Sequence, residues 1–152
     1  MEDRFKFRAV LKTDKHSIIV KPYYILDNGY LVSIDDAQKV FENKYPDDCF
    51  WEFIEEIEKQ ENCQEVSTDG EIIIFDSVDG LIQCTGLKDK NGKLIYEGDI
   101  VKIHNDVTAK VIFDKGCFSF TDGVYSQACY WKKDTLEVIG NVYQDKELFN
   151  EK

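Results

Sequence analysis

The chain has 152 residues and a mass of 17.7 kDa, with a net charge of −11 and a pI near 4.6. Its 43% hydrophobic residues suffice for one ordinary core or for two small sub-domains, which argues against a disordered chain. The acidic balance argues against general nucleic-acid binding, because a phosphate backbone needs a cationic surface.

The cysteines and the hydropathy pattern favour a reducing compartment. The five cysteines are odd in number and contain no Cys-x-x-Cys pair. No apolar run approaches the roughly 18 residues that a membrane helix needs, and the charged start of the chain lacks the apolar region of a signal peptide. We therefore expect a cytoplasmic protein in a bacterial host cell, without membrane contact.

The negative charge is concentrated in the first half of the chain. Residues 1–80 hold nine Lys and Arg against nineteen Asp and Glu, for a net charge of −10, whereas residues 81–152 hold ten against eleven, for −1. This difference weakens the argument against nucleic-acid binding for the second half, without reversing it.

The first elements read as strands and one short helix. Apolar residues at Phe5, Phe7, Ala9 and Leu11 follow the period of two that is typical of a half-buried strand. β-rich runs over 18–20 and 23–26 are split by Pro22, which predicts a sheet edge or the start of a strand. Ser33, with Asp36 three residues later, predicts the N-cap of a helix from about 35 to 43.

A second helix carries the most regular pattern of the first half. Phe50, Phe53, Ile54 and Ile57 are spaced i, i+3, i+4 and i+7, which predicts one apolar face after the start signal at 46–48. The face opposite is acidic: its charged residues are Glu52, Glu55, Glu56 and Lys59. A short apolar run at 72–75, of three isoleucines and a phenylalanine, then predicts a short buried strand.

The second half has a purely β pattern. Runs at 81–84, 99–104, 107–113, 117–121, 125–131 and 136–143 are separated by turn signals, and this spacing is typical of a small barrel or sandwich. We expect a mainly β protein with minor α content. Residues 1–79 would form an acidic β/α region with one or two inserted helices, and residues 80–152 a small SH3-like β-barrel that ends in a short turn or helical cap over 144–149. One joint core is the alternative.

Three turn signals lie between residues 85 and 103. Asn91-Gly92 between β-like flanks predicts a hairpin with a type I′ turn. Glu97-Gly98-Asp99 predicts a tight bend in which Gly98 takes a conformation closed to other residues and Asp99 binds nearby backbone amides. The glycines are thus explained by turn geometry without any function.

Three segments carry a family resemblance, and a fourth carries a weaker one: they are Gln83–Lys93, Ile95–Val101 and Glu137–Tyr143, and then Lys6–Ala9. These segments resemble the YopX family, a group of small proteins carried mainly by bacteriophages and prophages. The resemblance implies a phage-derived, cytoplasmic, mainly β protein, and it brings no catalytic residue or cofactor with it.

Candidate catalytic and metal-binding residues are few. One candidate is a nucleophilic pair of Cys84 or Cys117 with His104, since such partners meet only in space, but structural roles fit these residues better. No zinc-ligand spacing is present. Aromatic residues of the predicted strands are candidates for lining a ligand groove: Tyr125, Tyr130, Trp131 and Tyr143. Aromatic residues in strands more often pack in the core or form cross-strand pairs. We expect no catalytic residue, cofactor or metal.

We expect a non-enzymatic protein-interaction module that binds a host or phage protein. The candidate interaction surface consists of Asp48, Glu52, Glu55, Glu56, Tyr96, Glu97 and Asp99. One alternative is an acidic DNA mimic that inhibits a host nucleic-acid-binding protein, and a second is a small barrel that binds nucleic acid or a small ligand. Exposed strand edges offer a route to a homo-oligomer.

Overall fold

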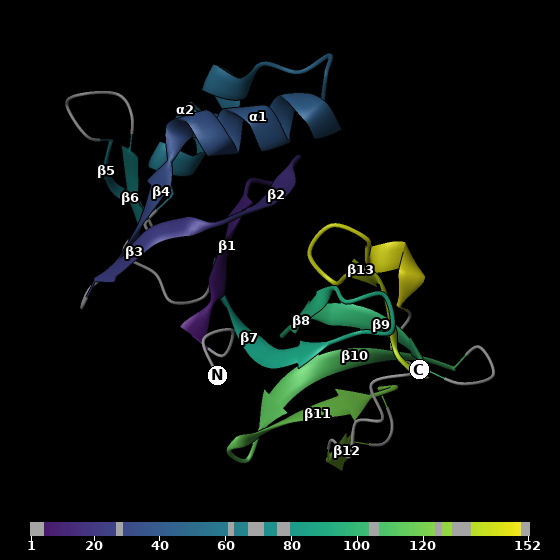
Figure 1. Cartoon of the computed structure of the whole chain (residues 1–152). Coiled ribbons are helices and arrows are strands. Elements are labelled where there is room, and N and C mark those ends of the chain that lie inside the picture. Colours follow the sequence, from purple (N-terminus) through teal and green to yellow (C-terminus); the bar gives the residue numbers. More distant parts are fainter. Residues whose placement is uncertain are drawn as a thin grey trace. The chain divides into compact units, whose positions relative to one another are not determined.

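The structure is a computed structural model of the chain, and it is mainly β, as the sequence predicts (Figure 1). It describes residues 5–26, 29–60, 63–66, 72–75, 80–103, 107–123, 126–128 and 135–149. The chain divides into two compact units. We call residues 7–81 the N-terminal unit, and residues 1–6 with 82–152 the C-terminal unit. The predicted boundary stood between residues 79 and 80.

The strands of the N-terminal unit are antiparallel. Strand β1 (Phe7–Lys12) pairs with β2 (Ser17–Val20), with Leu11 opposite Ile18. A four-stranded sheet has the order β3-β4-β6-β5, and its strands are β3 (Pro22–Leu26), β4 (Gly29–Ser33), β5 (Cys63–Val66) and β6 (Ile72–Phe75). Strand β3 starts at Pro22 and lies at the edge of this sheet, which confirms the prediction from that residue.

Both predicted helices form. Helix α1 (Ile34–Lys44) starts at the N-cap Ser33, whose hydroxyl oxygen accepts the Asp36 amide at 3.4 Å. This cap satisfies one of the free amides at the start of the helix. Helix α2 (Phe50–Glu58) buries all four residues that the helical spacing selected: Phe50, Phe53, Ile54 and Ile57.

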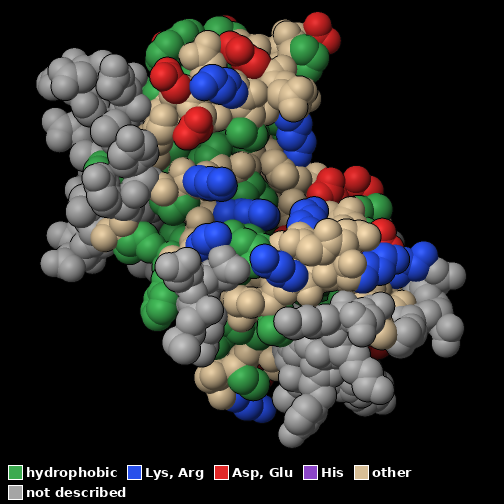
Figure 2. Space-filling model, viewed as in Figure 1, with side chains coloured by type: hydrophobic (Ala, Val, Ile, Leu, Met, Phe, Trp, Pro, Cys, Tyr) green, Lys and Arg blue, Asp and Glu red, His purple; other side chains and the backbone are tan. Residues whose placement is uncertain are grey.

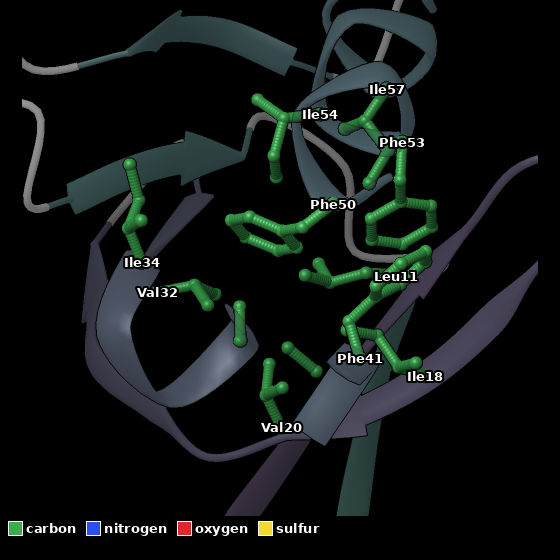
Figure 3. Close-up of a cluster of buried hydrophobic side chains, with 12 residues drawn as sticks. Leu11, Ile18, Val20, Val32, Ile34, Phe41, Phe50, Phe53, Ile54 and Ile57 are labelled. Atoms are coloured by element: carbon green, nitrogen blue, oxygen red, sulfur yellow. The ribbon is translucent and has the colours of Figure 1, made fainter. Parts of the chain in front are cut away.

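The core of the N-terminal unit lies where these helices meet the strands. Figure 3 shows Phe50 and Phe53 of α2 directed toward Phe41 of α1 and Leu11 of β1. Phe41 is fully buried, and its ring stacks on that of Phe53 with centroids 4.7 Å apart. Each such side chain contributes about 2 kcal/mol on leaving water, so this cluster holds the two helices in place.

The C-terminal unit contains a hairpin and a five-stranded antiparallel sheet. Strand β7 (Leu81–Lys88) pairs with β8 (Leu94–Tyr96). The larger sheet, of order β12-β11-β10-β9-β13, curves into a half-barrel (Figure 1). Its strands are β9 (Asp99–Ile103), β10 (Val107–Asp114), β11 (Cys117–Thr121), β12 (Ser126–Ala128) and β13 (Glu137–Asn141). The short 3-10 helix Lys146–Leu148 lies in the predicted terminal cap.

A second core lies in this unit. Val101 of β9 faces Ala109 of β10 in the strand register, and both are buried with Ile95, Val111 and Leu136. Alternate residues of β10 therefore point to the same apolar side of the sheet. The likeness to an SH3 barrel stays a prediction.

The Asn91-Gly92 turn differs from the prediction. Gly92 has a φ of +81°, but Asn91 does not have a positive φ, so the turn is not of type I′. The Gly92 amide donates to the Asp89 carbonyl at 3.0 Å, and the Asp89 amide to the Lys93 carbonyl at 2.8 Å. This is a three-residue loop with one left-handed residue. The Asp89 side chain stabilises this loop, because its carboxylate accepts the amides of Asn91 and Lys93, both at 2.9 Å.

Two further predictions about single residues have opposite outcomes. Phe5 lies outside β1 and is 79% exposed, so the alternating pattern of the first strand begins later than expected, with Ala9 and Leu11 as its buried residues. Gly98 has the left-handed conformation that its sequence context predicts, with a φ of +78°.

Candidate interaction sites

The exposed face of α2 carries one tryptophan and several carboxylates. Trp51 is 54% exposed, although it follows the buried Phe50, and its ring contacts that of Phe50 edge-on at 5.4 Å. Glu52 and Glu55 are also exposed, and neither forms an ion pair with any residue that the structure describes. An apolar ring and free carboxylates thus share one helix surface.

The other two acidic candidates in this unit have intramolecular partners. Asp48 Oδ2 lies 2.8 Å from Nε2 of His16, and Glu56 Oε1 lies 3.3 Å from Nζ of Lys15. The hydrogen bond from Lys15 holds the pKa of Glu56 below its usual value. Asp48 and Glu56 therefore attach the loop between β1 and β2 to the two ends of α2, and they are less available to a partner than Glu52 and Glu55.

His16 lies in an aromatic environment. Its ring makes edge contacts with Tyr45 at 4.6 Å, Phe41 at 5.3 Å and Phe53 at 6.1 Å. With one ring nitrogen directed at Asp48 and the ring packed on the core, His16 supports the start of α2. Its position explains the residue without a catalytic role.

The N-terminal unit shows both signs of charge in Figure 2. At the top of the view, over its helices, Asp and Glu side chains lie beside Lys or Arg and apolar side chains.

Tyr96 and Asp99, the candidates in the hairpin region, are buried. Tyr96 is 4% exposed and Asp99 is 3% exposed. Asp99 Oδ2 accepts the Tyr96 amide at 2.8 Å, which is the backbone contact that the sequence predicted for this bend. The Asp99 side chain therefore stabilises the bend, and neither side chain is available as an exposed surface.

Glu97, the third candidate in this region, is half-buried beside Gly98 and Tyr143. Burial raises the pKa of Glu97, although its carboxylate accepts the backbone amide of Phe113. A Cβ atom added to Gly98 would lie only 2.5 Å from Cε2 of Tyr143, so the tyrosine ring covers this glycine closely. Of the candidate residues in this region, Glu97 alone remains partly accessible.

Of the catalytic candidates, the structure describes the two cysteines. Cys84 is buried, and its thiol donates to the Ile95 carbonyl at 3.7 Å, which fits a structural role. Cys117 is exposed, and His104 lies outside the described residues, as do Tyr125, Tyr130 and Trp131. Within the described ranges, no three potential ligands gather into a group that could hold a metal ion.

Sequence reasoning missed Trp51 and Phe113. Both are large apolar residues left exposed at 54% and 48%, in elements whose apolar periodicity was recognised. The exposure of Trp51 could have been predicted from its position in the helix. It falls between the i and i+3 residues of the buried face, where a polar residue is expected.

The comparison with known families is decisive for the chain as a whole. The model of the family described as YopX protein matches residues 6–150. The chain belongs to the YopX family. Its segments Ile95–Val101 and Glu137–Tyr143, which carry the resemblance, meet where Tyr143 covers Gly98.

Among the solved structures that resemble this YopX protein is the crystal structure of protein EF1440 from Enterococcus faecalis. The two chains have 22% sequence identity and a TM-score of 0.45, over 95% of this chain and 97% of that chain. No curated protein matches the sequence. No helix among the described residues is long and apolar enough to cross a membrane.

Proposed function

We propose that this YopX protein is a non-enzymatic protein-interaction module whose binding surface is the exposed face of α2. The observation that carries the proposal is the exposure of Trp51 next to the exposed Glu52 and Glu55 on α2. Tryptophan is enriched among the few residues that dominate binding energy, and it acts when a partner removes it from water. The partner is a host or phage protein, in keeping with the expected phage origin.

The charge around Trp51 defines the partner further. Glu52 and Glu55 have no cationic partner among the described residues, and the N-terminal unit as a whole holds seven Lys and Arg against seventeen Asp and Glu. Such a surface attracts a basic one and speeds its association. The fitting partner has an apolar pocket for the indole, bordered by Lys or Arg.

Site-specific crosslinking tests this assignment in a bacterial lysate. A photoreactive residue replaces the exposed Glu58 of α2, and in a control protein it replaces the exposed Val107 of β10. A protein crosslinked at residue 58 and not at 107 is then purified for binding measurements. The proposal is wrong if crosslinking at the two positions captures the same proteins in equal amounts.

Affinity measurements on the purified partner give the quantitative test. We expect Trp51→Ala to weaken binding by more than about tenfold, as hot-spot residues do. We expect the double variant Glu52→Gln and Glu55→Gln to slow association and to reduce its salt dependence. The matched control is the double variant Asp114→Asn and Glu147→Gln, which removes equal charge from exposed positions in the other unit.

An acidic DNA mimic is the second candidate function, and the concentration of charge in the N-terminal unit favours it. The pairing of Asp48 with His16 and of Glu56 with Lys15 reduces the free negative charge along α2. The DNA mimic therefore ranks below the protein-interaction module as a candidate function. If it is correct, duplex DNA competes with this protein for the captured partner. If the partner binds this protein and DNA simultaneously, the mimic is excluded.

A further inference from the structure

Glu97 is a half-buried carboxylate that has no cationic partner in the part of the chain that the structure describes. It lies between β8 and Gly98, and its carboxylate accepts the amide of Phe113 at the end of β10. Burial is the main influence on its pKa and raises it. No Lys, Arg or His among the described residues forms an ion pair with Glu97. Because a buried charge is normally paired, this carboxylate can gain from a cation supplied by another molecule.

Tyr143 adds an uncommitted polar group next to this carboxylate. Its ring covers Gly98, and the charges of Glu97 and Asp99 add to burial in raising its pKa, which places the phenol close to both carboxylates. The hydroxyl group makes no hydrogen bond to any part of the chain that the structure describes. A half-buried hydroxyl group that is still accessible can donate to or accept from a ligand.

Phe113 exposes an apolar ring on the residue whose backbone amide Glu97 accepts. The residue is 48% exposed, and its ring contacts that of Phe118 edge-on at 5.0 Å. These two residues are opposite each other in the register of β10 and β11, so their rings lie on one side of the sheet. An exposed aromatic ring on a residue that contacts a carboxylate through its backbone favours a cation that is attached to a hydrocarbon chain.

We propose that Glu97, Tyr143 and Phe113 form a second binding site, which takes the Lys or Arg side chain of a partner polypeptide. The carboxylate pairs with the cationic group, the tyrosine hydroxyl group provides a hydrogen bond, and the hydrocarbon part of the side chain lies on the phenylalanine ring. This site belongs to the near-neutral C-terminal unit and is independent of the surface on α2.

Nuclear magnetic resonance on the labelled full chain tests the site with small probes. Acetyl-lysine methylamide is the cationic probe, and acetyl-norleucine methylamide is its neutral counterpart. We expect the lysine probe to shift the signals of Glu97, Phe113 and Tyr143, and to lower the pKa of Glu97 as read from its carboxyl carbon. Equal binding of the two probes, or an unchanged pKa of Glu97, overturns the proposal.

Two substitutions separate charge from structure. Glu97→Gln keeps an acceptor for the Phe113 amide and removes the negative charge. We expect this substitution to weaken binding of the lysine probe about tenfold. The control is Asp114→Asn, which removes an exposed carboxylate one residue beyond Phe113. If Asp114→Asn weakens binding of the lysine probe as much as Glu97→Gln does, the probe responds only to the general negative charge of the protein, and the proposal fails.

Pentylamine tests whether the cation comes from a free amine. Pentylamine carries the same single ammonium group on a hydrocarbon chain, without a peptide backbone. Binding weaker than that of the lysine probe supports a polypeptide ligand. Binding of equal strength, lost in Glu97→Gln, overturns the polypeptide source and leaves a free amine as the ligand of the site.

Discussion

Aspartate carboxylates accept backbone amides at several strand ends and bends in the C-terminal unit. Asp89 accepts the Val138 amide at 3.0 Å, Asp99 accepts the Tyr96 amide at 2.8 Å, and Asp145 accepts the Asn141 amide at 3.0 Å. Each amide would otherwise lack a partner in the ladder, which is costly where water is excluded. Single acidic residues, far apart in sequence, therefore complete the backbone bonding of this unit.

Asp89 makes this unit sensitive to acid. Burial acts to raise its pKa, but the amides of Val138, Lys93 and Asn91 outweigh burial and hold the pKa below its ordinary value. A carboxyl with a depressed folded pKa contributes stability above its unfolded pKa, near 4, and this contribution is lost as the pH falls through the folded value. We predict that Asp89→Asn lowers the free energy of unfolding by about 1–3 kcal/mol at pH 7.

The acid dependence of unfolding separates this role from a general loss of stability. Urea unfolding at pH 7 and below pH 4 should show that Asp89→Asn and the native chain differ less in acid. The exposed Asp114→Asn variant should follow the native chain at each pH. A constant difference between Asp89→Asn and the native chain across this range would contradict the assignment.

Gly98 has two reasons to be glycine, and they can be measured separately. Its φ of +78° disfavours other residues, and an added Cβ would collide with the Tyr143 ring. Gly92 has a similar φ of +81° with no atom within 4 Å of the added Cβ, so Gly92→Ala tests the backbone cost alone. We predict a loss of about 1 kcal/mol for Gly92→Ala and at least about 2 kcal/mol for Gly98→Ala in chemical unfolding. Equal losses would show that the tyrosine ring moves away easily.

At the scale of elements, the hairpin between β10 and β11 has a turn that its sequence does not favour. Lys115 and Gly116 separate the paired residues Asp114 and Cys117, and both have positive φ values, +50° and +82°. A two-residue turn of this kind prefers Asn-Gly, because a lysine side chain pays a steric cost in the left-handed region. The Asn-Gly sequence of this chain instead occurs in the three-residue loop at 90–92.

We predict that Lys115→Asn stabilises the chain by about 0.5–1 kcal/mol. The substitution keeps the turn and replaces a residue that resists positive φ with one that tolerates it. Urea unfolding monitored by tryptophan fluorescence and by circular dichroism measures the change. Lys93→Asn, at a turn position without positive φ, is the control and should not stabilise the protein. A destabilised Lys115→Asn variant would contradict the turn assignment.

The outer edge of β13 is closed to strand addition. Its Val138 and Asn141 amides donate to Asp89 and Asp145, so two donors that another strand would need are already occupied. A Cβ added at Gly140 would lie 2.8 Å from Leu148, which places the terminal 3-10 helix against this strand. Occupied and covered edges resist edge-to-edge pairing. Oligomer formation through a strand edge stays a prediction, and β13 is a poor edge for it.

The elements were predictable where a periodic pattern was long enough to identify a buried face. The four buried residues of α2 follow from helical spacing, and the start of β3 follows from Pro22. The candidate site was less predictable, because exposure depends on long-range packing. Tyr96 and Asp99 look like surface residues of a turn but are covered in the fold, and the contact of Tyr143 with Gly98 joins residues 45 positions apart.

At the scale of the whole molecule, two units with separate cores differ strongly in charge. The N-terminal unit holds seven Lys and Arg against seventeen Asp and Glu, and the remaining residues hold twelve against thirteen. Repulsion between like charges opposes compaction most in the first unit and weakens as salt is added. Its aromatic core around Phe41 has to offset this repulsion, so the two units need not have the same stability.

Separate cores predict local effects of core substitutions. We predict that Phe41→Ala, which removes a fully buried ring stacked on Phe53, costs about 3–5 kcal/mol and accelerates amide hydrogen exchange mainly within residues 7–81. Ile95→Ala, in the second core, should accelerate exchange mainly within residues 82–149. Mass spectrometry of proteolytic fragments reads both patterns. Uniform acceleration along the chain in either variant would mean that the two cores unfold as one cooperative unit, because local opening would then require the global transition.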